Sequence, residues 1–133
     1  MPLVRHPENP ILTRADIPAS EPHLVDVSSV FNPGAIRFRD RILLLLRVQN
    51  RGRETFLVRA DSDDGVRFRV REREVILEGI ERVRGPIFHV YDPRLTPLEG
   101  AFLATVALDT AVGCRVGIVR TIDFESFEFL GLA

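Results

Sequence analysis

One short stretch of the sequence combines a carboxylate and a guanidinium around a proline. This stretch, HVYDPRLTPLEG at residues 89–100, contains Asp92 and Arg94 just before an apolar segment. Enclosure in a pocket raises the pKa of a carboxylate through loss of solvation, whereas a nearby guanidinium lowers it, so the two side chains together could tune a general acid. The alternative is an Asp-Pro turn in which the carboxylate caps backbone amides. From the residues alone, the turn is the preferred interpretation.

A second candidate, Arg47, interrupts the apolar run LLLLRV. A guanidinium at the end of a buried strand needs a polar cavity or a charged partner, because an unpaired buried charge is strongly destabilising. A position in a pocket is therefore one interpretation, and a salt bridge to Asp26 or Asp109 is the other. Asp109 itself lies at the end of an expected strand and could face a pocket, although capping of a turn is its preferred role.

The composition argues against several other classes of protein. The net charge is −1, from 18 basic and 19 acidic residues, so no overall field attracts nucleic acid or an anionic membrane. His6, His23 and His89 lack metal-ligand spacing, so we expect no metal site. Cys114 is the only cysteine, which excludes an intrachain disulfide. No signal-peptide pattern opens the chain, and the longest aliphatic run, residues 42–46, is too short to span a bilayer, so we expect a cytoplasmic protein.

The elements that must position these residues are short strands. Residues 1–23 contain five of the nine prolines and are expected to form an extended arm that lies across another part of the chain. Beyond them, branched and aromatic runs of about five to eight residues alternate with turn signals. The segment VRFRVRERE alternates apolar residues with arginines, which predicts an outer strand whose charges discourage edge pairing rather than an RNA-binding strand. The chain is therefore predicted to be all-β.

The second half of the chain repeats the first. FNPGAIRFRDRILLLLRV (31–48) has its counterpart in YDPRLTPLEGAFLATVAL (91–108), so that Asn32-Pro33 matches Asp92-Pro93 and an RD turn matches an EG turn. Further on, SDDGVRF (62–68) matches TIDFESF (121–127). In each of these shorter segments an aspartate is expected to cap the turn between outer strands, and a phenylalanine is expected to pack between the repeats. These residues are Asp64, Asp123, Phe68 and Phe127.

A repeat of about 60 residues with four short strands has the size of one β-propeller blade. The predicted fold is an all-β propeller, with blade 1 at residues 24–78 and blade 2 at residues 79–133. The innermost strands of a propeller begin at one face, and their starts converge on an axial pocket. We expect these strands to start near Asn32 and Asp92, which would bring the two side chains together. Tyr91, the only tyrosine, could line that pocket or pack its ring between the blades.

Five segments carry a resemblance to a known family in their order and spacing. They are NPILTRADIP (9–18), VFNPGAIRF (30–38), LLLRVQNRGRETFLVRADSDDG (44–65), VYDPRLTPLEG (90–100) and GCRVGIVRTIDFESFEFLG (113–131). Together they resemble glycoside hydrolase family 130, which comprises β-mannoside phosphorylases and related β-mannosidases. The resemblance covers essentially the whole chain. It implies a five-bladed propeller whose substrate, a β-linked mannose-containing oligosaccharide, lies in the axial pocket.

The resemblance also implies roles for individual residues. It places the catalytic acid on Asp92, which would protonate the departing glycosidic oxygen while phosphate or water attacks from the opposite face. This interpretation then replaces the turn cap. Asn32 and Arg47 match positions that hydrogen-bond the sugar, and Arg53, in a loop, matches a further pocket arginine. The remaining candidates for contact with substrate are neighbours of the acid, namely Tyr91 and Arg94.

Two repeats supply fewer than half of the blades of such a propeller. We therefore expect an amino-terminal portion that binds sugar weakly and turns over little substrate without the remaining blades or self-association. Inorganic phosphate would be the co-substrate of a phosphorylase, and no cofactor is expected. The resemblance places most residues that hold phosphate in later blades. The alternative function is a non-catalytic module that oligomerises through its open sheet face and binds carbohydrate. Another five-bladed glycosidase family is a less favoured interpretation.

Overall fold

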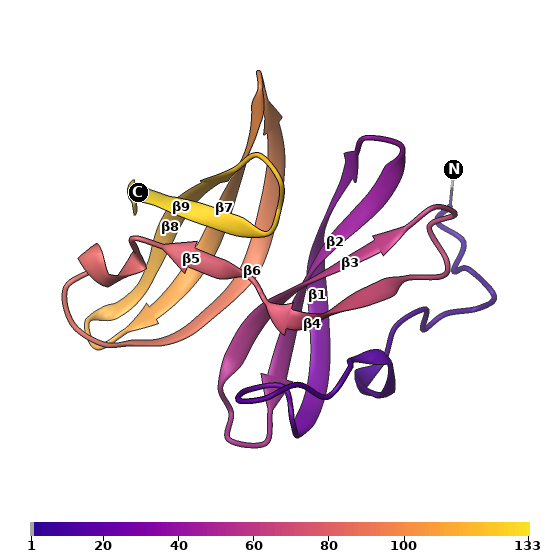
Figure 1. Ribbon diagram of the computed structural model, residues 1–133, viewed down its shortest axis with the longest axis horizontal. Coiled ribbons are helices and arrows are strands. Elements are labelled where there is room, and N and C mark those ends of the chain that lie inside the picture. Colours follow the sequence, from indigo (N-terminus) through magenta and orange to yellow (C-terminus); the bar gives the residue numbers. More distant parts are fainter. Residues whose placement is uncertain (1) are drawn as a thin grey trace.

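The computed structural model describes residues 2–133, which form two sheets that lie side by side (Figure 1). The first sheet has the strand order β1-β2-β3-β4 and the second has the order β5-β9-β8-β7-β6. The strands are β1 (Val27–Phe38), β2 (Arg41–Asn50), β3 (Thr55–Ser62), β4 (Arg69–Glu74), β5 (Ile76–Glu78), β6 (Ile87–Leu98), β7 (Ala101–Thr110), β8 (Gly113–Thr121) and β9 (Ser126–Leu132). Two single 3-10 turns complete the elements, η1 (Arg14–Asp16) and η2 (Ile80–Arg82). The predicted all-β fold is confirmed.

Each sheet contains four consecutive antiparallel strands, and the second sheet gains a fifth from the connecting segment. β5, which lies within the range 24–78 expected for blade 1, pairs in parallel with β9. The pairing runs from Ile76 opposite Ser126 to Glu78 opposite Glu128. The chain that leaves the first sheet therefore adds an outer strand to the second sheet and ties the two together.

The two innermost strands lead into tight hairpins at matching positions. Arg39 and Asp40 join β1 to β2, and Glu99 and Gly100 join β6 to β7. Arg39 has a φ of 56° and Gly100 a φ of 72°. Positive φ values of this kind are typical of two-residue hairpin turns. The turns predicted from the RD and EG dipeptides are confirmed.

The turns between the outer strands are capped by the two repeated aspartates. Oδ1 of Asp64 accepts hydrogen bonds from the amides of Val66 and Arg67. Oδ1 of Asp123 accepts hydrogen bonds in the same way from the amides of Glu125 and Ser126. These backbone donors lower the pKa of Asp64 to about 2 and also lower the pKa of Asp123, because they stabilise the ionised carboxylates. The predicted capping role is confirmed.

The main hydrophobic core lies between the two sheets. β2 contributes Leu43 and Leu45, and β7 contributes Val106 and Leu108, all of them fully buried. Alternation along a strand places every second side chain on the same face, so each of these strands turns one face toward the other sheet. Burial of side chains of this size stabilises a fold by about 1.5–3 kcal/mol each.

A cluster of aromatic rings forms part of this core. Phe124 is fully buried although it lies in a turn with a φ of 63°. Its ring centroid lies 4.9 Å from that of Phe38 and 4.7 Å from that of Phe102. Phe127 lies 5.9 Å away, which confirms that its ring packs between the repeats. Phe68 packs on the other face of the first sheet, which is turned away from the second sheet. This face is equivalent in the repeat to the face of Phe127, so the packing of Phe68 against another blade stays a prediction.

The amino-terminal segment packs on that other face of the first sheet (Figure 1). Ile17 and Leu24 are buried there among apolar side chains of β2 and β3. His23 stacks on Phe56 with 4.8 Å between ring centroids, and its Nδ1 lies 2.9 Å from a carboxylate oxygen of Glu74. The segment therefore lies across the sheet and shields its apolar face.

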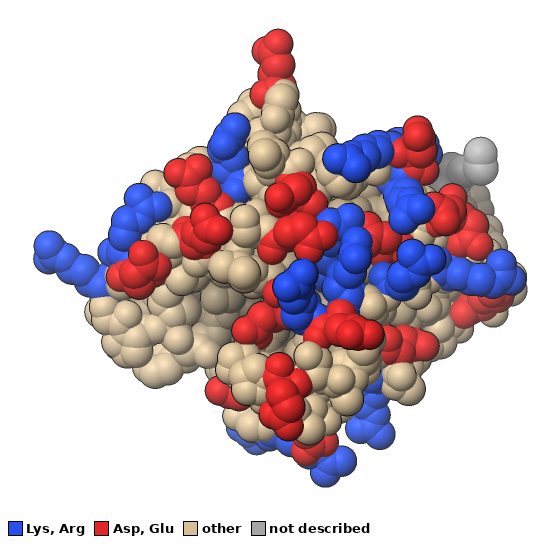
Figure 2. Space-filling view, viewed as in Figure 1, with Lys and Arg blue, Asp and Glu red and all other residues tan. Residues whose placement is uncertain are grey.

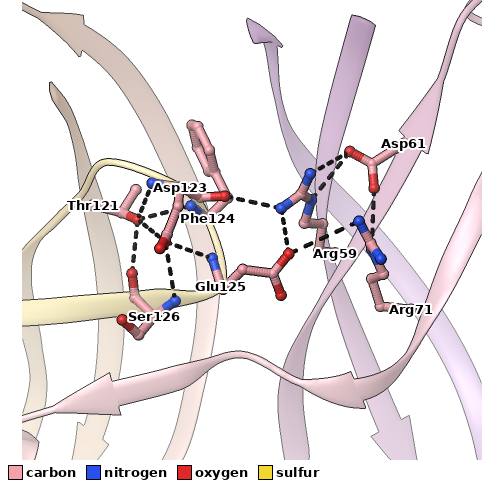
Figure 3. A network of polar contacts seen from close by, with 8 residues as sticks. All are labelled: Arg59, Asp61, Arg71, Thr121, Asp123, Phe124, Glu125 and Ser126. Carbon is pink, nitrogen blue, oxygen red and sulfur yellow. Dashed lines mark hydrogen bonds and ion pairs between the residues drawn. The ribbon is translucent and has the colours of Figure 1, made fainter. Parts of the chain in front are cut away.

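A network of charged side chains joins the two sheets through β3 and the turn before β9 (Figure 3). Arg59 donates to Oδ1 of Asp61 from Nε and Nη2, at 3.1 and 2.8 Å. Its Nη1 donates to Oε1 of Glu125 at 2.7 Å and to the carbonyl oxygen of Asp123 at 2.9 Å. Nε of Arg71, on β4, lies 3.3 Å from the second carboxylate oxygen of Asp61. Because one buried guanidinium contacts both sheets, the network fixes how the sheets face each other.

Candidate active site

The motif residues lie at matching irregularities of the two innermost strands. In β1, Asn32 and Pro33 together oppose a single residue of β2. In β6, Asp92 and Pro93 oppose a single residue of β7 in the same way. Such β-bulges leave one residue out of the hydrogen-bonded ladder and re-aim its side chain. Proline is tolerated there because it has no N–H to contribute to the ladder.

The innermost strands do not start where the sequence predicted. β1 begins at Val27 and β6 at Ile87, upstream of Asn32 and Asp92 in both cases. Proline commonly marks a strand boundary, which is why the two polar-Pro pairs suggested strand starts. The bulge lets each strand continue past its proline, so the motif lies in the middle of the strand.

Asp92 carries the carboxylate at the centre of this arrangement. Its φ of 51° is left-handed, a conformation that aspartate tolerates better than most residues with a Cβ atom. Its Oδ1 accepts hydrogen bonds from Nδ2 of Asn32 at 3.2 Å and from Nη1 of Arg47 at 3.1 Å. Within residues 2–133, no hydrogen bond or ion pair is made by its Oδ2. One carboxylate oxygen is therefore anchored by the preceding sheet, and the other is free.

Arg47 reaches Asp92 from the first sheet between two aromatic rings. Its guanidinium carbon lies 4.7 Å from the centroid of Phe31 and 4.6 Å from the centroid of Tyr91. Its Nε is buried without a hydrogen-bond partner among the described residues. The alternative partners weighed from the sequence do not pair with it: Asp26 forms its ion pair with Arg51, and Asp109 has no ion pair in the described chain.

A close backbone approach brings the two strands together. A Cβ atom at Gly34 on β1 would lie 2.8 Å from the carbonyl oxygen of Pro93 on β6. This is closer than real Cβ contacts occur, so the position accepts glycine alone without a shift of one strand. The approach occurs one residue beyond the Asn32-Pro33 bulge. This contact therefore fixes the separation between β1 and β6 next to Asp92.

Tyr91 links the site to the next strands of the second sheet. Its hydroxyl lies 3.5 Å from Sγ of Cys114 on β8. The hydrogen bond to Cys114, together with burial, raises the pKa of Tyr91 above its usual value of 10.0, while Arg47 acts in the opposite direction. The ring thus contributes its face to Arg47 and its hydroxyl to Cys114. The sequence suggested that Tyr91 either lines the pocket or packs its ring between the blades. Its ring contacts Arg47 of the other sheet, next to Asp92.

Two arginines predicted at the site have other surroundings. Arg94 is exposed, and its Nη1 donates to the carbonyl oxygen of Pro93 rather than to the carboxylate of Asp92. Arg53 is an exposed loop residue between β2 and β3 with a φ of 66°, and no side-chain hydrogen bond or ion pair joins it to another residue of 2–133. The guanidinium that accompanies Asp92 is therefore Arg47.

One residue of the site was missed in the sequence. Phe31 precedes Asn32 as Tyr91 precedes Asp92, and it pairs with Arg47 across the β1–β2 ladder. The repeat contained the signal, since it aligns FNP with YDP. The aromatic residue alone does not indicate a site, because phenylalanine and tyrosine are common in strands.

Two absences complete the description of residues 2–133. They contain no group of three or more His, Cys, Asp and Glu side chains that could hold a metal ion. No helix in this part of the chain is long and apolar enough to cross a membrane.

The geometry suits proton transfer by a carboxyl group. A general acid needs one oxygen that can reach the departing group and surroundings that hold the carboxyl group in place. Oδ1 of Asp92 is held by an amide and a guanidinium, and Oδ2 is the oxygen left for a proton or a ligand. The side chain of Asp92 is 39% exposed, so a ligand can reach it.

Sequence comparison relates the chain to one family over almost its whole length. It matches glycoside hydrolase family 130, described as β-1,4-mannooligosaccharide phosphorylase, over residues 2–131. It is also similar to 4-O-β-D-mannosyl-D-glucose phosphorylase of Bacteroides fragilis, with 32% identity over 146 residues. That alignment covers 97% of this chain and 37% of the relative, so the chain spans little more than a third of its length.

Solved structures share the fold. The β-1,2-mannobiose phosphorylase of Listeria innocua, in complex with β-1,2-mannobiose, gives a TM-score of 0.77 at 19% identity, over 99% of this chain and 51% of that one. A second structure represents the family 130 of mannoside phosphorylases, which contains glycoside hydrolases that target β-1,2 mannosidic linkages in Candida mannan. It gives a TM-score of 0.79 at 20% identity, over 97% of this chain and 40% of that one. The family neighbours are five-bladed propellers, which confirms the predicted propeller fold with about two of its blades present.

Proposed function

The chain belongs to glycoside hydrolase family 130, a family of mannoside phosphorylases and glycosidases, and from this membership we propose that Asp92 is the general acid for cleavage of a β-linked mannoside. One observation carries the proposal. Oδ1 of Asp92 is held by Asn32 and Arg47 of the preceding sheet, while Oδ2 has no partner within residues 2–133. Oδ2 can then protonate the departing glycosidic oxygen, directly or through a sugar hydroxyl.

The substrate is a β-linked mannose-containing oligosaccharide, and the reaction proceeds with inversion. In an inverting mechanism the nucleophile attacks the anomeric carbon from the face opposite the acid, with room between the acid and the group that activates the nucleophile. Inorganic phosphate is the co-substrate if the reaction is phosphorolysis, and water is the nucleophile if it is hydrolysis. No further cofactor is required by either reaction.

Asn32 and Arg47 serve this chemistry in two ways. Their donors fix the rotamer of Asp92, and the free Nδ2 hydrogen of Asn32 and Nη2 hydrogens of Arg47 remain available to sugar hydroxyls. The side chains that bind the attacking phosphate, or activate the attacking water, are supplied by further blades or by a second copy of the chain. The 133-residue chain by itself should therefore bind sugar weakly and turn over little or no substrate.

The test is Asp92→Asn in the native gene product, assayed for release of mannose, and of mannose 1-phosphate when phosphate is present. Asparagine keeps the shape and accepts the two anchoring hydrogen bonds but cannot donate an acidic proton. We expect loss of about 100-fold or more in kcat with an unchanged melting temperature. Asp26→Asn is the matched control, because Asp26 forms a surface ion pair with Arg51. Retention of activity by Asp92→Asn would exclude this residue as the acid.

A second candidate function is a non-catalytic, self-associating carbohydrate-binding module. It is favoured by apolar side chains on the second sheet. Val116 lies opposite Ala107, on the face turned away from the core residues Val106 and Leu108, and is 44% exposed. Exposed apolar sheet faces promote association. Light scattering on the 133-residue chain decides: a defined oligomer that binds mannobiose without cleaving it supports this function, and a monodisperse monomer with a cooperative melt contradicts it.

A further inference from the structure

Two aromatic rings at equivalent positions of the repeat enclose one guanidinium. Phe31 precedes the bulge of β1 and Tyr91 precedes the bulge of β6, and both ring faces lie within 4.7 Å of the guanidinium carbon of Arg47. In the second sheet, Ala107 stands opposite Tyr91 as Arg47 stands opposite Phe31. Arg47 therefore lies between the two repeats, and each repeat contributes one aromatic ring that packs against its guanidinium.

The enclosure leaves an N–H of Arg47 without a partner. Nε is buried and makes no hydrogen bond among the described residues. An unsatisfied buried donor destabilises a fold, because its hydration is lost without a replacement. A guanidinium over an aromatic face is attracted by the negative face of the ring. Two such faces can offset the unsatisfied donor, so the rings are the groups that make this position of Arg47 tolerable.

The position of Arg47 determines which oxygen of Asp92 is available. Its Nη1 and Nδ2 of Asn32 donate to the same oxygen, Oδ1. If the guanidinium could tilt, its remaining donors could also engage Oδ2 in the two-point arrangement that arginine commonly forms with carboxylates. Such a bidentate pair would occupy both oxygens and leave neither to carry a proton.

We propose that Phe31 and Tyr91 are positioning residues, whose rings clamp Arg47 in a one-point contact with Oδ1 of Asp92 and so reserve Oδ2 for the glycosidic oxygen. The proposal rests on the proposed function of Asp92 as general acid, and it assigns the reacting oxygen and the groups that select it. The side chain of Phe31 is not involved in binding the proton, and the phenol of Tyr91 is engaged with Cys114. Both residues act through Arg47.

The first measurement follows the Nε–H resonance of Arg47 by nuclear magnetic resonance in the uniformly ¹⁵N-labelled 133-residue chain, with Arg47→Lys to assign it. Ring currents from two faces and exclusion from solvent predict an upfield-shifted signal that exchanges slowly with water. Tyr91→Leu and Phe31→Leu should each move the signal downfield and speed its exchange. Tyr91→Phe keeps the ring and should preserve both properties. A wild-type signal at the position and exchange rate of exposed arginines would overturn the clamp.

The second measurement uses the native gene product and the assay for β-mannoside cleavage. Phe31→Leu and Tyr91→Leu are expected to lower kcat by about 10- to 100-fold with a smaller rise in KM, because the acid loses its free oxygen while Arg47 alone among the sugar-binding groups changes its contacts. Tyr91→Phe should retain kcat within about threefold. Melting temperatures of the variants exclude unfolding as the cause.

The outcomes separate this proposal from the one on which it rests. Loss of activity in Asp92→Asn with full activity in both leucine variants overturns the positioning role and leaves the general acid in place. Full activity in Asp92→Asn overturns the general acid instead, whatever the resonance of Arg47 shows. Equal loss of kcat in Tyr91→Phe and Tyr91→Leu would place the effect in the phenol hydroxyl and overturn the role of the ring.

Discussion

Gly34 of β1 passes so close to β6 that a Cβ atom at this position would lie 2.8 Å from the carbonyl oxygen of Pro93. The backbone of Gly34 is not in the left-handed region, so the constraint is one of space rather than of conformation. The contact joins the two bulged strands next to the residues that meet at Asp92. It therefore couples the packing of the sheets to the geometry of the candidate site.

Gly34→Ala is expected to destabilise the chain by about 1–3 kcal/mol, because the new methyl group meets backbone atoms that cannot move aside independently. Denaturant unfolding of the 133-residue chain measures the change. Gly52→Ala is the control, because a Cβ atom there meets flexible side-chain atoms of Asn50 and Glu54 at 3.2 Å or more. Equal stability of the two variants would show that the strands can separate at this point without a penalty.

The internal repeat was the most informative feature of the sequence. Matching of Asn32-Pro33 with Asp92-Pro93 predicted two similar sheets, the hairpin turns and the meeting of these two polar side chains. The repeat works as a predictor because equivalent residues occupy equivalent places in successive blades. The capping aspartates, Asp64 and Asp123, were found in the same way.

Contacts between the sheets were harder to predict. Only one proline separates Arg94 from Asp92 in the sequence, but the Arg94 side chain donates to the carbonyl oxygen of Pro93. The guanidinium that donates to Asp92 comes instead from Arg47, in the other sheet. The sequence pattern of a bulged strand does not reveal on which face each residue emerges, since one extra residue reverses the alternation.

Arg59 also joins the two sheets, through hydrogen bonds to Asp123 and Glu125 in the turn before β9 (Figure 3). The space-filling view shows that basic and acidic side chains gather together where the two sheets meet (Figure 2). In the network of Figure 3, the side chain of Asp61 is only 6% exposed and that of Arg59 is 11% exposed. Removal of the guanidinium would leave a buried carboxylate with Arg71 as its remaining charged partner.

Arg59→Met is therefore expected to destabilise the chain by about 3–5 kcal/mol, the range found when one partner of a buried ion pair is removed. Arg41→Met is the matched control, since Arg41 pairs with Asp63 at 3.0 Å on the surface with both side chains more than half exposed. That change should be worth less than about 1 kcal/mol. Denaturant midpoints of both variants give the comparison. A similar small effect in both would mean that the network does not hold the sheets together.

Tyr91 offers a direct spectroscopic test of the site, because it is the only tyrosine and the chain has no tryptophan. Ultraviolet absorbance of the phenolate therefore follows the pKa of this one side chain. The hydrogen bond to Cys114 and burial raise the pKa of Tyr91 above 10.0, whereas the charge of Arg47 lowers it. The titration midpoint of the wild-type chain should accordingly lie above 10.0.

Substitutions of the two neighbours should move this midpoint in opposite directions. Cys114→Ala removes the largest upward influence and should bring the pKa of Tyr91 down toward its usual value. Arg47→Met removes the nearby positive charge, which favours the phenolate, and should raise the pKa further. Circular dichroism on the same samples shows whether the fold survives the alkaline range. Because the ring of Tyr91 can sense both side chains only when it lies between them, a midpoint that neither substitution moves would contradict its place beside Arg47 and Cys114.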